Sequence, residues 1–204
     1  PWGLLNCWFW TQDEKDEARV KDDPWVKYLS GNDDAFPMRE LKKEFGIIRS
    51  KVAGMRADTT TPDTRLADDP MKYNPATVQT LNKLMMAGLD PGRGAAPLHC
   101  RLRYFDPVKR RAGIPEDVAA LIDDISDDEV SVTLVNVSQT QSRELIVQAG
   151  AYGEHRITQV KNRMDSVKVD QSTFRVKLEP GCGTRLVISN DRYVGQPTMS
   201  FPWH

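Results

Sequence analysis

The sequence predicts an α+β fold, in which an irregular helical segment precedes a C-terminal antiparallel β-sandwich. Between Glu129 and Ser189, short runs of β-branched and apolar residues are separated by turns that contain glycine. Earlier in the chain, apolar residues recur instead every three or four positions, as on one face of a helix. We therefore expect a mainly helical part over residues 1–125 and a β-sandwich domain over 126–204.

The helical part begins with an aromatic segment over residues 2–10, followed by a solvated stretch over 11–23 and one helical turn over 24–29. Clustered aromatic side chains belong either to a core or to an interface, and here we favour an interface. The expected interface residues are Trp2, Trp8, Phe9, Trp10 and Trp25. A free-standing protein seldom begins with such a segment, so we expect the chain to be the C-terminal region of a longer protein.

Three further helices are expected, over residues 38–53, 75–87 and 115–125, because each has an apolar stripe and a proline at or beside its first residue. In the first, the stripe consists of Met38, Leu41, Phe45, Ile48 and Val52. A long polar loop rich in Thr, Asp and Pro is expected over 56–73, and a strand over 99–105. The residues before 126 thus predict a helical segment that wraps a neighbouring surface.

Four strands are expected in the C-terminal part, over residues 129–137, 142–149, 173–178 and 184–189. In the third, apolar residues at 174, 176 and 178 alternate with basic residues at 175 and 177. A period of two indicates one buried and one solvent-facing side, as in an antiparallel sheet.

The composition excludes several function classes. The chain has 28 basic and 29 acidic residues, and this balance disfavours a nucleic-acid-binding role. Its longest apolar run is too short to span a membrane. The three cysteines are widely spaced, which argues against a disulfide framework and a zinc site. The acidic loop over 56–73 lacks the calcium-binding EF-hand spacing, so no metal and no cofactor are predicted.

The string 149–155 contains the candidate catalytic residues Tyr152, Glu154 and His155. A carboxylate and an imidazole within hydrogen-bond reach can act as an acid–base pair. Neighbouring residues on a strand point to opposite faces, however, so a hairpin or bulge with hydrogen-bonded ends is the favoured interpretation.

A basic group near the middle of the chain offers a candidate anion site. It includes Arg101, Arg103 and Arg110, whose guanidinium groups suit a phosphate or a carboxylate. Neutralisation of acidic segments of this chain, or of another domain, is the favoured alternative.

Four stretches together carry a family resemblance: 51–70, 103–107, 113–121 and 147–155. They resemble the C-terminal region of large, mostly uncharacterised bacterial proteins related to the linalool dehydratase/isomerase-like group. That resemblance implies a bacterial source, in the cytoplasm or the periplasm, and an (α/α)6 barrel in the missing N-terminal region. It covers the appendage and not the barrel, so no catalytic residue of that group is placed here.

A second likeness is at the level of the fold alone. Many α/α-barrel enzymes that act on sugars end in a β-sandwich with strands similar to 132–138 and 176–181 of this chain. We therefore expect an accessory or structural region of a larger bacterial enzyme, either lyase/isomerase-like or carbohydrate-active. The alternative is a binding module for a carbohydrate or a partner protein within an assembly. An enzyme that uses Tyr152, Glu154 and His155 is a third hypothesis.

Overall fold

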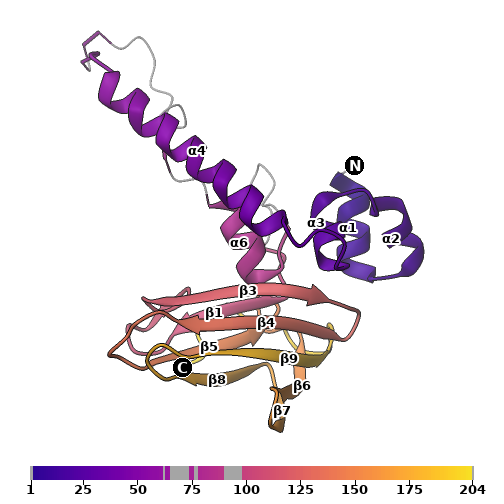
Figure 1. Ribbon diagram of the computed structural model, residues 1–204. Coiled ribbons are helices and arrows are strands. Elements are labelled where there is room, and N and C mark those ends of the chain that lie inside the picture. The colour runs from indigo at the N-terminus through magenta and orange to yellow at the C-terminus, as the bar shows by residue number, and fades with distance from the viewer. Residues whose placement is uncertain (1, 62, 65–73, 76–77, 90–97, 204) are drawn as a thin grey trace.

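The structure, a computed structural model, describes residues 2–61, 63–64, 74–75, 78–89 and 98–203. Helices occupy the N-terminal part and two antiparallel sheets the C-terminal part, so the predicted α+β class is confirmed (Figure 1). Of the loop expected over 56–73, residue 62 and residues 65–73 lie outside the described residues.

Three short helices form the first unit: α1 (Trp2–Thr11), α2 (Glu14–Val20) and α3 (Pro24–Leu29). The carboxylates of Asp13 and Asp23 each accept a backbone N–H in the first turn of the following helix, which begins α2 and α3. The expected solvated stretch over 11–23 therefore contains a helix, while the helical turn expected over 24–29 is confirmed.

Helix α4 (Phe36–Ala57) is longer than the expected helix over 38–53. Its 22 residues span about 33 Å and extend away from the rest of the molecule (Figure 1). Helix α6 (Gln79–Met86) begins later than the helix expected over 75–87, and Ala87 ends it in the left-handed conformation. Within the described residues, no helix has both the length and the apolar character needed to span a membrane.

The strands form two sheets whose pairings are all antiparallel. The first sheet has the order β2 (Arg111–Ala112), β1 (Leu102–Asp106), β5 (Arg143–Ala149), β8 (Thr173–Leu178). The second has the order β3 (Val118–Ile125), β4 (Glu129–Asn136), β9 (Gly183–Asp191), β6 (Arg156–Lys161), β7 (Ser166–Gln171). All four strands expected between residues 129 and 189 are present, and β6 and β7 were not anticipated.

The prediction of a helix over residues 115–125 is wrong, because residues 118–125 form the edge strand β3. Val118 and Ile122 are buried at even spacing, but the pairing with β4 shifts register between Ile122 and Asp124. This bulge returns Ile125 to the buried face. The result is a spacing of four and then three residues, which imitates a helical stripe.

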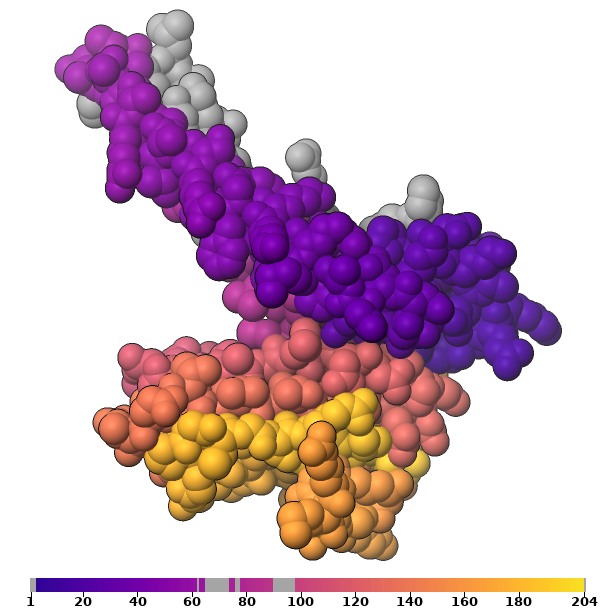
Figure 2. All heavy atoms as spheres, viewed as in Figure 1, coloured from indigo at the N-terminus to yellow at the C-terminus, as the bar shows by residue number. Residues whose placement is uncertain are grey.

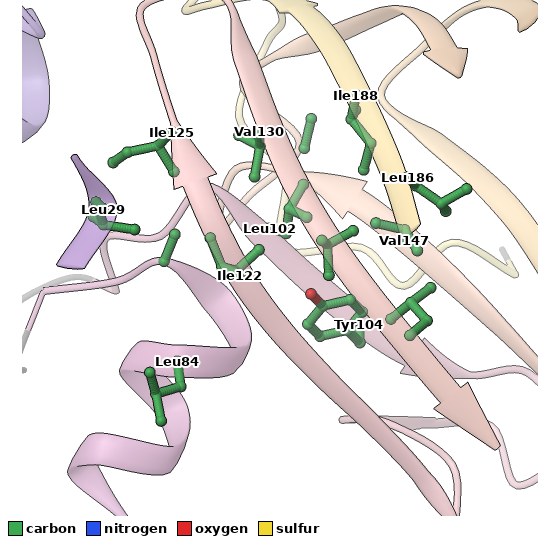
Figure 3. Close-up of a cluster of buried hydrophobic side chains, with 14 of the residues drawn as sticks. Leu29, Leu84, Leu102, Tyr104, Ile122, Ile125, Val130, Val147, Leu186 and Ile188 are labelled. Carbon is green, nitrogen blue, oxygen red and sulfur yellow. The ribbon is translucent and has the colours of Figure 1, made fainter. Parts of the chain in front are cut away.

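The core lies between the two sheets and continues into the helices as one cluster. Figure 3 shows Leu84 of α6 and Leu29 of α3 beside the sheet residues Leu102, Tyr104 and Ile122. Strands β1 to β3 precede residue 126, so the sheets extend beyond the predicted sandwich boundary. The division of the chain into two domains at that residue stays a prediction.

Two tyrosine hydroxyls fasten the helices to the sandwich. The Tyr28 hydroxyl donates to the carbonyl oxygen of Ile122 at 2.8 Å, and the Tyr104 hydroxyl donates to that of Met85 at 2.6 Å. Burial raises the pKa of Tyr28 to about 12, so it remains a hydrogen-bond donor at neutral pH. Helices α3 and α6 thereby cover the side of the sandwich where β1 and β3 lie.

Candidate functional site

The turn that follows β5 brings together Tyr152, Glu154 and His155. Gly150 opens it with a φ of +82°, a left-handed conformation that glycine adopts without strain. The carboxylate of Glu154 accepts the backbone N–H of Ala151 at 3.2 Å and that of Tyr152 at 2.7 Å. Both carboxylate oxygens of Glu154 therefore hold the backbone of the turn. The structure places these residues in a turn rather than on a strand.

His155 is buried at the end of this turn, with its ring edge-on to that of Tyr193 at 4.6 Å between centroids. Its Nδ1 accepts the backbone N–H of Tyr193 at 3.0 Å. Burial lowers the pKa of His155 to about 4. The nearby charges of Arg101 and Arg192 also lower this pKa, whereas the charge of Glu154 raises it. The imidazole is therefore neutral at neutral pH.

Arg101 is buried beside the turn that joins β3 to β4. Its Nη2 donates to the carbonyl oxygens of Ser126 at 2.6 Å and Asp127 at 3.3 Å. Among the described residues, nothing accepts a hydrogen bond from its Nε or its Nη1. Burial, followed by the charge of Arg192, lowers the pKa of Arg101 to about 10. The guanidinium stays charged, although burial makes that charge costly.

Arg192 joins the sandwich to the first helix. It donates to the carbonyl oxygens of Trp10 at 2.7 Å and Thr11 at 3.1 Å, and it also pairs with the carboxylate of Asp127. The carbonyl groups at the end of a helix carry partial negative charge, which a guanidinium group neutralises. We call Arg101, Asp127, His155 and Arg192 the junction cluster, because they connect α1, the β3–β4 turn and the turn after β5.

The contacts of the junction cluster and of the neighbouring Glu154 and Cys100 are structural in kind. Both oxygens of Glu154 and the Nδ1 of His155 are engaged by backbone N–H groups. Burial raises the pKa of the Cys100 thiol, so this thiol is not a ready nucleophile. Within the described ranges, no three His, Cys, Asp or Glu side chains are grouped to hold a metal ion. A catalytic role for Tyr152, Glu154 and His155 stays a prediction that these contacts do not support.

The other candidate anion-binding residues have surroundings of their own. Arg103 Nη1 donates to the carbonyl oxygen of Ala151 at 2.8 Å, and its guanidinium carbon lies 5.0 Å from the ring centroid of Phe105. Arg110 is exposed in the turn between β1 and β2. Arg101 and Arg110 lie at opposite ends of β1, so the expected anion site is not formed by the three arginines together.

The aromatic set predicted as an interface divides into two parts. Trp8, Phe9 and Trp25 are buried in the core of this chain, so these three side chains do not form the predicted interface. Trp10 is 52% exposed, and its carbonyl oxygen contacts Arg192. The side chain of Trp2 lies outside the described residues. Trp10 is thus the described member of the set that a partner can reach.

The sandwich contains an apolar pocket on the side away from the helices. A cavity of about 480 Å³ lies between β8 of one sheet and β6, β7 and β9 of the other. Its apolar lining includes Val160, Val167, Val169, Phe174, Val176 and Leu186. The sequence reasoning missed this pocket because it did not predict β6 and β7. The spacing of two between Val167 and Val169 was the available signal.

Helix α4 presents a second exposed apolar surface, formed by Met38 and Phe45 of its predicted stripe together with Met55. Met38, Phe45 and Met55 are 61%, 57% and 48% exposed. Figure 2 shows α4 as an arm that stands clear of the sandwich for much of its length. The sequence identified the stripe from Met38 to Val52 within a segment expected to wrap a neighbouring surface, but it did not show which of its members are exposed.

Comparison with known proteins gives a partial match. Residues 7–84 match the family model described as a domain of unknown function, DUF8034. This match begins within α1 and ends within α6, and its described residues include no strand. No curated protein matches the chain.

One solved structure that matches is a provisionally assigned alpha-N-acetylgalactosaminidase from Bacillus halodurans. It is 19% identical, with a TM-score of 0.32, and the match covers 46% of this chain and 21% of that chain. The matched part, less than half of this chain, thus spans about a fifth of that protein. A likeness at this level says nothing about activity.

Proposed function

We propose that this chain is a non-catalytic accessory region of a larger bacterial enzyme and that it contacts and braces the rest of that enzyme. The observation that supports this role most strongly is the exposed apolar stripe of α4. Three large, exposed apolar side chains on a projecting helix are costly to leave in water. Contact with another surface removes this cost.

The junction cluster supports the same proposal from another direction. Its charged groups fasten the first helix to the sandwich through Arg192 and the β3–β4 turn. Together with the hydrogen bond from Tyr28 to Ile122, these contacts make the sandwich the base that holds α1 and α3. In keeping with the family resemblance, the partner enzyme is lyase/isomerase-like or carbohydrate-active, with an α/α barrel.

The proposal is tested by producing the preceding part of the full reading frame and this chain as two polypeptides. We expect them to associate, and we expect Phe45→Asp to abolish association. The matched control is Ile47→Asp, an exposed apolar residue about 200° around the same helix, which should leave association unchanged. A reading frame with no further domain, or equal effects of the two variants, would contradict the proposal.

Carbohydrate binding is the second candidate function, and one local feature favours it. Trp10 and Tyr193 are both exposed, and both contact Arg192: Trp10 through its backbone carbonyl oxygen, and Tyr193 through its ring, whose centroid lies 5.7 Å from the guanidinium carbon. Exposed aromatic rings suit the apolar faces of a sugar. Glycan-array binding that Trp10→Ala removes would favour this module function, and an array without signal would exclude it.

A further inference from the structure

The apolar stripe of α4 follows a heptad repeat. Its five predicted members, continued by Met55, are separated by three, four, three, four and three residues. They are Met38, Leu41, Phe45, Ile48, Val52 and Met55. An apolar repeat that averages 3.5 residues is the pattern of a helix that packs along a second helix. Helix α6 of this chain already contacts part of α4, and the same spacing suits a second helix along the part that stays exposed.

The rest of this chain covers one edge of the stripe and leaves the other edge open. On the covered edge, the buried Glu44 accepts the backbone N–H of Thr80 at 2.8 Å, and Lys51 donates to the carbonyl oxygen of Asn74 at 2.8 Å. Leu41, Ile48 and Val52 are half-buried, whereas Met38 and Phe45 are exposed. A partner helix must therefore approach from the side of Met38 and Phe45.

A row of positive charge flanks this open side. Lys42, Arg49 and Arg56 follow Met38, Phe45 and Val52 by four residues each, so they lie on the same face of the helix. All three are exposed, and none forms an ion pair among the residues described here.

Other basic residues of α4 are neutralised, which makes the row distinctive. Arg39 pairs with Asp33 at 2.8 Å, and Lys43 pairs with Glu40 at 3.4 Å. The row on the open side is thus a spaced series of unneutralised charges beside an apolar surface.

These charges decide against a second copy of the same helix as the occupant. In an antiparallel pair, the row Lys42, Arg49 and Arg56 would face the same row of the other copy and repel it. In a parallel pair, the basic row of one copy would face Glu44 and Lys51 of the other copy. Those two residues already contact their own chain and are not available.

Building on the proposed contact-making role, we propose that the open side of α4 binds an acidic amphipathic helix of the larger protein. That helix presents apolar residues to Met38 and Phe45 and carboxylates at seven-residue spacing to the basic row. A membrane surface fits less well, because Arg49 and Arg56 interrupt the exposed face, whereas membrane-bound helices have a broad apolar side.

The test uses two synthetic peptides of about three heptads, with leucine at the seam positions and either glutamate or lysine at both flanks. Binding to this chain is measured by fluorescence anisotropy. We expect the glutamate peptide to bind about tenfold more tightly than the lysine peptide, from the sum of three exposed ion pairs. The triple variant Lys42→Glu, Arg49→Glu, Arg56→Glu should reverse this preference.

Phe45→Asp should abolish binding of the glutamate peptide, and Ile47→Asp should leave it unchanged, with circular dichroism showing that both variants are folded. Equal binding of the two peptides, binding of neither, or self-association that depends on Phe45 would overturn the acidic-helix proposal. Binding to vesicles of anionic lipid that Phe45→Asp removes would overturn it too. If Phe45→Asp still prevents association with the rest of the enzyme, the contact-making role stands without the acidic partner.

Discussion

The buried His155 makes the stability of this chain depend on pH in a defined direction. Its folded pKa is about 4, against 6.5 for an unperturbed histidine. Between these values the unfolded state binds more protons than the folded state, so stability falls as the pH falls. The His155 contribution is intact above about pH 6.5 and is lost progressively toward pH 4.

The size of the effect follows from the two pKa values. Each unit of difference is worth about 1.4 kcal/mol, so the full effect is about 3 kcal/mol. Between pH 7.5 and pH 5, the expected loss is about 2 kcal/mol. In that interval carboxylates with ordinary pKa values stay mostly ionised, which makes the histidine contribution separable.

The assay is urea unfolding of the wild-type chain and of His155→Asn at both pH values. The asparagine Oδ1 can accept the N–H of Tyr193 in place of Nδ1, but it does not titrate. We expect the wild type to lose about 2 kcal/mol more than the variant between pH 7.5 and pH 5. The same pH dependence in both proteins would refute the conclusion that the imidazole is buried and neutral.

Three further substitutions test other parts of the structure. Arg192→Ala should cost about 1–3 kcal/mol and speed amide exchange in α1, because two carbonyl groups at the end of that helix lose their donor; unchanged exchange in α1 would contradict this. Tyr28→Phe should cost about 1 kcal/mol by removing the hydrogen bond to the Ile122 carbonyl, and a melting temperature equal to that of the wild type would exclude it. Gly46→Ala should stabilise α4 by about 1 kcal/mol, since an added Cβ meets nothing within 4 Å; slower amide exchange in α4 is the readout, and faster exchange is the opposing result.

Period-two alternation and glycine-bounded runs were sufficient to predict β4, β5, β8 and β9. They failed at β3, where the bulge at Asp123 makes a strand look helical. They also failed at β6, which is mostly half-buried, and at β7, which is mostly exposed; both strands are polar along much of their length. A strand that gains stability by pairing with its neighbours rather than by burial leaves little pattern in the sequence.

The candidate site was predictable only in part. The sequence identified the turn around Glu154 and His155 as unusual, but it could not show that backbone N–H groups occupy their polar atoms. Arg192 had no local signal, because its partners at Trp10 and Thr11 are distant in sequence. The apolar stripe of α4 could be predicted from its spacing. The exposure of its side chains could not, because it depends on how α4 projects from the sandwich.

The central claim is that another part of the larger protein covers the exposed side of α4. Methionine oxidation read by mass spectrometry tests this directly, because Met38 and Met55 report on α4 while Met164 and Met199 lie exposed in the C-terminal part. In this chain alone, all four should oxidise readily. In the full-length protein, we predict that Met38 and Met55 become protected while Met164 and Met199 remain reactive. Equal oxidation of Met38 and Met55 in both forms would contradict the account.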